Sequence, residues 1–417
     1  MKPGRRKRVA VAVASIAILL AGAGPHEAPP APSRKADRIP LPQRASPNPI
    51  QTVRVFSALQ ERIVLGSAEA LQRQAGLAKE IGEILLKFGP DTWNDARNRQ
   101  AAIKFVLMGG DPKVVEALSR RAVFKGFEVA LANGALAFAY GDRKAAEVEF
   151  GSVDPRSLPP GLGGYAALIM AVLVGVSDPS KGLAFSDEAR LLSLGTGVEE
   201  AALRLSIELA IAANSPQHFY RAFRHHVRRF PSSLYGPTID LRIARVLAAN
   251  ELKLGPDADA LAVIMDSDLP QERRLRLLEE LVKAGLRRGV GATAALAAQH
   301  LRTLADGDPN LLDLCRAADA ASAIFDGRRS EARTLLSQPD SAAATSESKA
   351  LLEELRALIV ALEAPPAKLE IARDKRSGGI SGSLYLAQAP LARFESLTKQ
   401  VETALDDADK LLRRTGS

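Results

Sequence analysis

From residue 51 onwards, apolar residues recur at intervals of three or four positions. The stretch between residues 71 and 88 is typical, with apolar side chains at Leu71, Ala75, Ala78, Ile81, Leu85 and Phe88. This spacing places them on one face of an α-helix. Residues that favour helices dominate the same region, and convincing alternating strand patterns are missing. The pattern therefore predicts an all-α fold.

Turn signals interrupt this helical pattern at near-regular intervals. The steps between their first residues are 31, 36, 37, 41, 34 and 37 positions, and each turn lies between two stretches of helix length. Helix–turn–helix units with a period in the thirties are typical of tetratricopeptide-like solenoids. We expect a solenoid of degenerate helical hairpins over residues 51–364. Its turns are Gly110-Asp111-Pro112, Gly141-Asp142, Ser177-Asp178-Pro179, Asn214-Ser215-Pro216, Gly255-Pro256, Gly289-Val290-Gly291 and Asp326-Gly327.

The first fifty residues follow a different pattern. Residues 1–23 contain a basic start, an apolar run from Val9 to Leu20 and the small residues Ala21-Gly22-Ala23. This is the pattern of a secretory signal peptide, so we expect cleavage after Ala23 and a periplasmic location. The apolar run is shorter than the roughly 20 residues of a spanning helix, which disfavours an uncleaved anchor. Residues 24–50 contain eight prolines and predict a disordered, extended linker.

The helical pattern also changes near the C-terminus. Pro365-Pro366 interrupts it, and residues 365–389 predict a second linker. Residues 390–417 then predict a final helix, whose apolar-leaning positions alternate in steps of three and four. That is a heptad spacing, typical of a helix that packs along a partner helix. The positions are Leu391, Phe394, Thr398, Val401, Leu405, Ala408 and Leu412.

Charge and cysteine content exclude two classes of function. The formal net charge is +8, but residues 1–50 carry +7 of it and residues 51–417 only +1. Nucleic-acid binding needs a concentrated basic surface, so we expect none. The single cysteine, Cys315, excludes an intramolecular disulfide framework and a zinc site built from several thiolates. Because Cys315 lies in an apolar stretch, we expect it to be a small buried hydrophobe.

The candidate catalytic and ligand-binding patterns mostly favour structural interpretations. His225 and His226 point about 100° apart on a helix and cannot chelate one metal well. The glycines at 161, 163 and 164 follow two prolines rather than a strand, which excludes a phosphate-binding loop. Glu347-Ser348 and Glu395-Ser396 match the dipeptide of lytic transglycosylases, and we interpret both as chance. We therefore expect no enzyme, no cofactor, no metal and no small-molecule substrate.

One helix carries the most basic patch of the body. Phe219, Phe223, Val227 and Phe230 share one face, which is typical of a core-facing side. The other faces carry the basic patch Arg221, Arg224, Arg228 and Arg229. One hypothesis is that this patch binds an acidic segment of a protein partner. The alternative is a solvated face, or one neutralised by the acids of the preceding hairpin, which are Asp187, Glu188, Glu199 and Glu200.

Several segments between about residues 50 and 250 resemble the MotC family of periplasmic motility proteins from alpha-proteobacteria. The order of these segments carries the resemblance, because none of them is a catalytic motif. They are Leu59-Gln60-Glu61-Arg62-Ile63 with Leu65-Gly66, Trp93-Asn94-Asp95-Ala96-Arg97-Asn98, Gly109-Gly110-Asp111-Pro112, Val198-Glu199-Glu200-Ala201-Ala202-Leu203-Arg204, and Arg229-Phe230-Pro231-Ser232-Ser233-Leu234-Tyr235.

The resemblance implies a non-enzymatic periplasmic protein that is needed for flagellar rotation. It further implies a chaperone-like role towards the periplasmic part of the stator protein MotB. Two alternatives stay open. The first is a tetratricopeptide-like periplasmic scaffold for assembly of the cell envelope or of polysaccharide. The second is a diverged cell-wall hydrolase.

Overall fold

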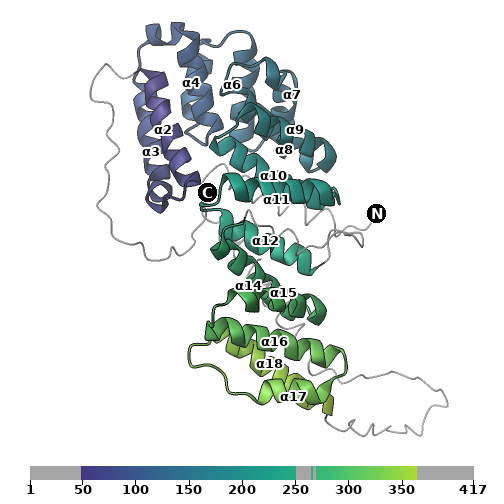
Figure 1. Cartoon of the computed structure of the whole chain (residues 1–417). Coiled ribbons are helices and arrows are strands. Elements are labelled where there is room, and N and C mark those ends of the chain that lie inside the picture. Colours follow the sequence, from purple (N-terminus) through teal and green to yellow (C-terminus); the bar gives the residue numbers. More distant parts are fainter. Residues whose placement is uncertain (1–47, 250–263, 266–268, 364–417) are drawn as a thin grey trace, which may run out of the picture. The chain divides into compact units, whose positions relative to one another are not determined.

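The computed structural model describes residues 48–249, 264–265 and 269–363, and within them the fold is all-helical with no strand. Figure 1 shows the helices following one another along the chain. Two short 3-10 helices, η1 (Pro90–Asn94) and η2 (Pro155–Ser157), join longer ones. The α-helices are α2 (Pro49–Val64), α3 (Ala68–Leu86), α4 (Ala96–Leu107), α5 (Lys113–Arg120), α6 (Phe127–Ala139), α7 (Arg143–Gly151), α8 (Gly163–Gly175), α9 (Pro179–Leu192), α10 (Gly197–Ala212), α11 (Pro216–Arg229), α12 (Gly236–Ala248), α14 (Gln271–Arg287), α15 (Gly291–Leu304), α16 (Pro309–Phe325), α17 (Arg329–Ser337) and α18 (Ser346–Glu363).

Six of the seven predicted turns separate two consecutive helices. They lie between α4 and α5, α6 and α7, α8 and α9, α10 and α11, α14 and α15, and α16 and α17. The turn before α9 shows why these residues end one helix and begin the next. Asp178 accepts a hydrogen bond from the backbone N–H of Lys181, and Pro179 occupies the first helical turn. The seventh turn, Gly255-Pro256, lies outside the described residues.

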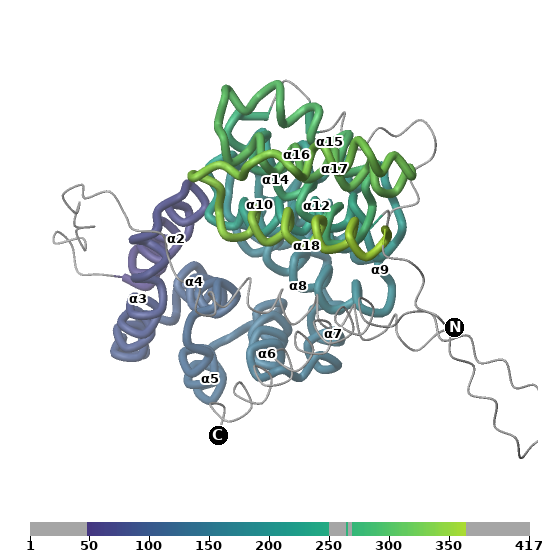
Figure 2. The backbone as a smooth tube through the Cα atoms, turned by 90° about the horizontal axis from the view of Figure 1, so that it is seen from below, coloured from purple at the N-terminus to yellow at the C-terminus, as the bar shows by residue number. Residues whose placement is uncertain are grey.

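Successive helices pack against one another as in a helical solenoid. Each hairpin partner touches its neighbour, and alternate helices such as α2 and α4, or α8 and α10, also touch. One contact departs from this nearest-neighbour pattern, because α2 also packs against α10. Figure 2 shows α2 beside α10. The N-terminal hairpin, formed by α2 and α3, therefore contacts the middle of the helical array directly. A simple stack of repeats has no such contact, because each repeat touches only its neighbours.

Helix α8 is the centre of the hydrophobic core. All its residues except Tyr165 are buried. One side, including Leu168 and Val172, joins the core that continues through α10 to α16. The other side, including Ile169 and Leu173, joins the core of α2 to α7. Despite this apolar surface, none of the helices in the described ranges is long and apolar enough to cross a membrane.

Close approach of α8 and α9 depends on two glycines. A Cβ added to Gly182 would lie 2.7 Å from the Cα of Gly175 and 3.0 Å from Cδ1 of Leu209. Real Cβ contacts of this length do not occur, so the two helices could not pack at this separation with any larger residue at position 182.

The helical array begins two residues earlier than the sequence predicts. Helix α2 begins at Pro49, because Asn48 caps it and proline suits its first turn. The last two residues of the predicted linker 24–50 therefore belong to a helix. At the other end, α18 finishes at Glu363. The predicted signal peptide 1–23, the linker 365–389 and the heptad helix 390–417 lie outside the described residues.

We predict that the same substitution has opposite effects at two helical glycines. Gly182→Ala should lower the free energy of unfolding by about 1–3 kcal/mol, because the new methyl group overlaps Gly175 and Leu209. Gly76→Ala should raise it by about 0.5–1 kcal/mol, because Gly76 is exposed within α3 and its added Cβ meets nothing within 4 Å. Urea unfolding followed by circular dichroism measures both. Equal effects would contradict the tight contact between α8 and α9.

Candidate functional site

Three segments that are far apart in the sequence meet where α2 contacts α10. They are the C-terminal half of α2 with its following loop, the start of α10, and residues 229–235 between α11 and α12. Glu61 of α2 accepts a hydrogen bond of 3.2 Å from the backbone N–H of Gly197 at the start of α10. Three of the five segments that carry the sequence resemblance therefore converge at one place.

Gly66 fits the loop after α2 against the segment 229–235. The backbone N–H groups of Gly66 and Ser67 donate to the carbonyls of Ile63 and Arg62, which is the Schellman pattern of a helix end. Gly66 has a φ of +95°, and a Cβ there would lie 2.7 Å from the carbonyl oxygen of Ser232. Both the left-handed backbone and the close approach require glycine.

A buried carboxylate, that of Glu200, is at the centre of this junction. It accepts hydrogen bonds from Nε of Arg204 at 2.7 Å, from Nε2 of His226 at 3.0 Å and from Oγ of Ser233 at 2.9 Å. All four residues are buried. Burial alone would raise the pKa of Glu200, but Arg204, His226 and Ser233 outweigh it and lower the pKa to about 2. Glu200 is therefore ionised across the physiological pH range.

The ionised Glu200 fixes the tautomer of His226. A carboxylate only accepts hydrogen bonds, so Nε2 of His226 carries the proton. Its Nδ1 is buried and has no hydrogen-bond partner among the described residues. Burial lowers the pKa of His226, and the positive charges of Arg273 and Arg204 lower it further, against the opposing effect of Glu200. The imidazole is therefore neutral near pH 7.

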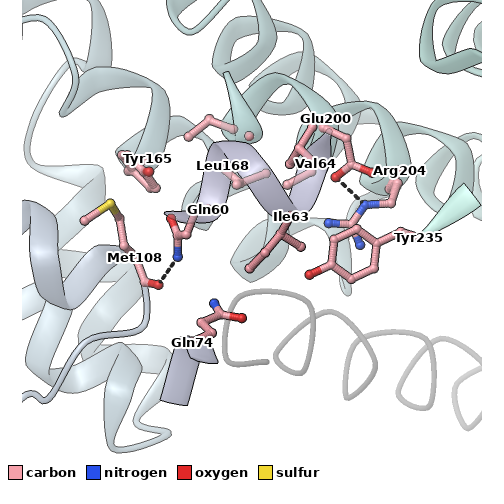
Figure 3. Close-up of a pocket in the computed structure, with 13 residues that line it drawn as sticks. Gln60, Ile63, Val64, Gln74, Met108, Tyr165, Leu168, Glu200, Arg204 and Tyr235 are labelled. Atoms are coloured by element: carbon pink, nitrogen blue, oxygen red, sulfur yellow. Dashed lines mark hydrogen bonds and ion pairs between the residues drawn. The ribbon is translucent and has the colours of Figure 1, made fainter. Parts of the chain in front are cut away.

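Arg204 connects this buried cluster to a cleft. Its guanidinium lies over the ring of Tyr235, 4.0 Å from the ring centroid, in a cation–π contact. Arg204 and Tyr235 form one end of the cleft, Gln60, Gln74 and Met108 lie towards the other, and Ile63, Val64 and Leu168 lie between them (Figure 3). The side-chain amide of Gln60 donates to the carbonyl of Met108 at 2.8 Å. The cavity measures about 60 Å³.

The predicted basic patch lies on α11, on the side away from the core. Phe219, Phe223, Val227 and Phe230 are buried as predicted, and all four arginines are exposed. Arg221 pairs with Asp187 at 3.1 Å and Arg229 pairs with Glu199 at 2.7 Å. Acids of the preceding helices therefore neutralise at least Arg221 and Arg229. Whether Arg221, Arg224, Arg228 and Arg229 bind a partner stays a prediction.

The other residues that the sequence analysis considered for catalysis or ligand binding make contacts that explain them as parts of the fold. Cys315 is buried, which confirms the prediction, and burial raises the pKa of its thiol to about 11. Glu347 lies in the first turn of α18 and pairs with Lys283 and Arg287. Gly163 and Gly164 begin α8 in close contact with Pro155 and Ser193. The described ranges bring together no group of three metal-ligating side chains. Glu395 lies outside them.

Sequence reasoning missed the cluster around Glu200. It treated Glu200 as a surface acid opposite the basic helix, whereas the structure buries this side chain completely. The pair Glu200 and Arg204, four residues apart on one helix, was the available signal. Nothing in that spacing shows that His226 and Ser233 approach the same carboxylate, because tertiary packing brings them there.

Two comparisons with known proteins point to the same family. The family described as "Chemotaxis protein MotC" matches residues 3–417, so the similarity extends well beyond residue 250. A curated relative, "Chemotaxis protein MotC" of Rhizobium meliloti (strain 1021), is 25% identical over 379 residues, which cover 86% of each chain. No solved structure matches the chain.

We predict that protonation of His226 lowers the free energy of unfolding in mild acid. The pKa of His226 is lower in the folded than in the unfolded chain. The neutral imidazole therefore makes its full contribution to the free energy of unfolding above about pH 6.5, and this contribution is lost as the pH falls towards the folded pKa. The limiting slope for one proton is about 1.4 kcal/mol per pH unit. His226→Gln keeps a donor for Glu200 but cannot titrate, so its unfolding free energy should fall less between pH 7 and pH 5.

The matched control for this prediction is His225→Gln. His225 is the neighbouring histidine and is only partly buried. Burial and nearby arginines lower its pKa too, but it does not bond Glu200. Urea unfolding at pH 7, 6 and 5 should give a flatter pH dependence for His226→Gln than for His225→Gln. An identical dependence in both variants would mean that the buried imidazole is not the group responsible.

Proposed function

Because the chain belongs to the MotC family, we propose that it acts in the periplasm as a non-enzymatic helper of the flagellar stator protein MotB. Membership of this family gives the protein a role related to motility and chemotaxis. The finer role, stabilising the periplasmic part of MotB in the manner of a chaperone, rests on the resemblance and on the secretory pattern of residues 1–23. The match over residues 3–417 is the observation that carries this proposal.

The chemistry of the junction supports a binding role rather than a catalytic one. Glu200, whose buried carboxylate lies beside the cleft, accepts three hydrogen bonds from Arg204, His226 and Ser233. A pKa of about 2 makes Glu200 a poor general base near neutral pH. The same bonds occupy Nε2 of His226. These groups hold three segments together, and helical hairpins of this kind present extended surfaces to protein partners.

We predict that a clean deletion of the gene gives cells that carry flagella but do not rotate them. Soft-agar spreading and tethered-cell rotation measure motility, and electron microscopy counts the filaments. Expression of the full chain from a plasmid should restore rotation. Loss of filaments would argue against a role at the stator. Altered cell shape or polysaccharide with normal swimming would instead favour an envelope scaffold.

We predict that charge reversal on α11 weakens association with an acidic segment of the partner. The double variant Arg224→Glu and Arg228→Glu should stay folded, because exposed substitutions usually cost under about 0.5 kcal/mol. Its association with the partner should weaken, because like charges then face each other, and added salt should no longer weaken it further. Sedimentation of the purified chain with the periplasmic domain of MotB at two salt concentrations measures both.

The control for this experiment separates lost binding from lost folding. Phe223 is buried in the core, so Phe223→Ala should cost about 3–5 kcal/mol and reduce function through unfolding. Circular dichroism must therefore accompany every motility result. If the double arginine variant swims as well as wild type and binds the same partner with the same salt dependence, the basic patch is only a solvated face.

A further inference from the structure

The described helices form two blocks, α2 to α11 and α12 to α18, which the turn at residues 230–235 joins (Figure 1). Helix α10 packs along α11 in the first block, and α12 packs along α14 in the second. Among the described helices, none of one block packs as closely against a helix of the other. The blocks instead meet through side chains, because one apolar core contains residues of both. A few residues of a turn placed in this way can act as a hinge.

Five buried charged or titratable side chains lie across this boundary, and we call them the boundary cluster. Glu200 and Arg204 of α10 form an ion pair, and His226 of α11 bonds the same carboxylate. On the other side, Asp240 of α12 and Arg273 of α14 form an ion pair with a shortest N–O distance of 2.7 Å. All five side chains are buried. The two sides interact, because Arg273 acts electrostatically on His226, and His226 on Asp240.

The boundary cluster also holds the turn against the first block. Oγ of Ser233 donates a hydrogen bond of 2.9 Å to Glu200. The guanidinium of Arg204 lies 4.0 Å from the ring centroid of Tyr235, the last residue before α12. Both contacts join α10 to the turn itself. The position of the turn therefore depends on the charge state of the cluster.

The boundary cluster is neutral only while His226 is neutral, because its two carboxylates and two guanidinium groups balance. A proton on Nδ1 of His226 adds a buried positive charge that no acid of the cluster compensates. It also creates a donor without an acceptor, since Nδ1 has no hydrogen-bond partner among the described residues. Nη1 of Arg273 is already a buried donor without such a partner. Water can solvate these donors only if the boundary opens.

We propose that the turn between α11 and α12 is a proton-controlled hinge, which is closed while His226 is neutral and opens when His226 binds a proton. Opening lets water reach the imidazolium and separates Tyr235 from Arg204. Because Arg204 and Tyr235 form one end of the cleft, the proton also changes the surface that the protein presents. This inference goes beyond the proposed function and requires no partner.

Asp240 is the rival proton acceptor of the boundary cluster. Burial raises the pKa of Asp240, although Arg273 and Arg276 oppose this effect. The pKa of Glu200 is about 2, so Glu200 stays ionised in mild acid. A variant that removes only the imidazole therefore separates the two groups that titrate.

Hydrogen exchange of the full chain, measured by mass spectrometry at pH 7.0 and 5.5 and corrected for intrinsic exchange, locates the opening. Peptides of α11, the turn and α12 should exchange several-fold faster at pH 5.5, because one proton changes an opening constant by at most about tenfold per pH unit. Peptides of α4 and α6 in the first block, and of α17 in the second, should keep their rates. Equal acceleration in all peptides, or none at the boundary, overturns the proposal.

Two pairs of variants identify the groups responsible. In His226→Gln the exchange at the boundary should be the same at both pH values, whereas His225→Gln should respond as the wild type does. A pH response that persists in His226→Gln overturns the proposal and assigns the proton to Asp240. Ser233→Ala removes a bond to Glu200 and should speed boundary exchange at pH 7.0 roughly threefold or more. Equal rates in Ser233→Ala and in the exposed control Ser232→Ala also overturn it.

A distance measurement shows whether the blocks move as units. Spin labels are attached to Ser180→Cys of α9 and Gln299→Cys of α15, both exposed, after Cys315→Ala removes the buried natural thiol. The distance distribution should change between pH 7.0 and 5.5, and in the His226→Gln background it should not. A pair within the first block, Ser180→Cys with Lys79→Cys of α3, should give the same distribution at both pH values. An unchanged distribution between the blocks, or an equal change within the first block, overturns the hinge.

Discussion

The central part of the structure depends on the hydrogen bonds that the buried carboxylate of Glu200 accepts. A buried charge is tolerated only when it is paired and hydrogen-bonded, and Glu200 takes its partners from α10, α11 and the turn before α12. Satisfying one carboxylate therefore fixes three successive elements relative to one another. The same bonds orient Arg204 over Tyr235 and so form one end of the cleft. Removing either Glu200 or Arg204 would leave the other as an uncompensated buried charge.

The contact between α2 and α10 gives the helical array a feature that stacked hairpins lack. In a simple solenoid each repeat is stabilised by its immediate neighbours, and a site forms on a continuous surface. Here the bond from Gly197 to Glu61 and the fit of Gly66 against Ser232 join residues separated by more than 130 positions. The cleft depends on this closure, because its walls come from both sides of the contact. The shape of the cleft therefore depends on how the N-terminal hairpin packs as well as on α10.

The arginines of α11 and the buried Arg204 differ in how strongly salt can affect their ion pairs. On α11, Arg221 and Arg229 are held by Asp187 and Glu199, so an acidic segment that binds there competes with existing ion pairs and is sensitive to salt. The pair of Arg204 and Glu200 is buried, so salt screens it much less.

The sequence by itself determined the all-α class, six of the turns between helices, the core face of α11 and the burial of Cys315, because periodicity and turn residues are local properties of the chain. The resemblance to the MotC family could also be recognised from short segments, and the full-length match supports it. Only the tertiary structure decided that these segments meet, that α2 packs against α10 and that Glu200 is buried. Spacing along one helix predicts which residues share a face, but it does not predict which distant face covers them. The cleft exists because packing of the hairpins brings Gln74, Arg204 and Tyr235 around one space.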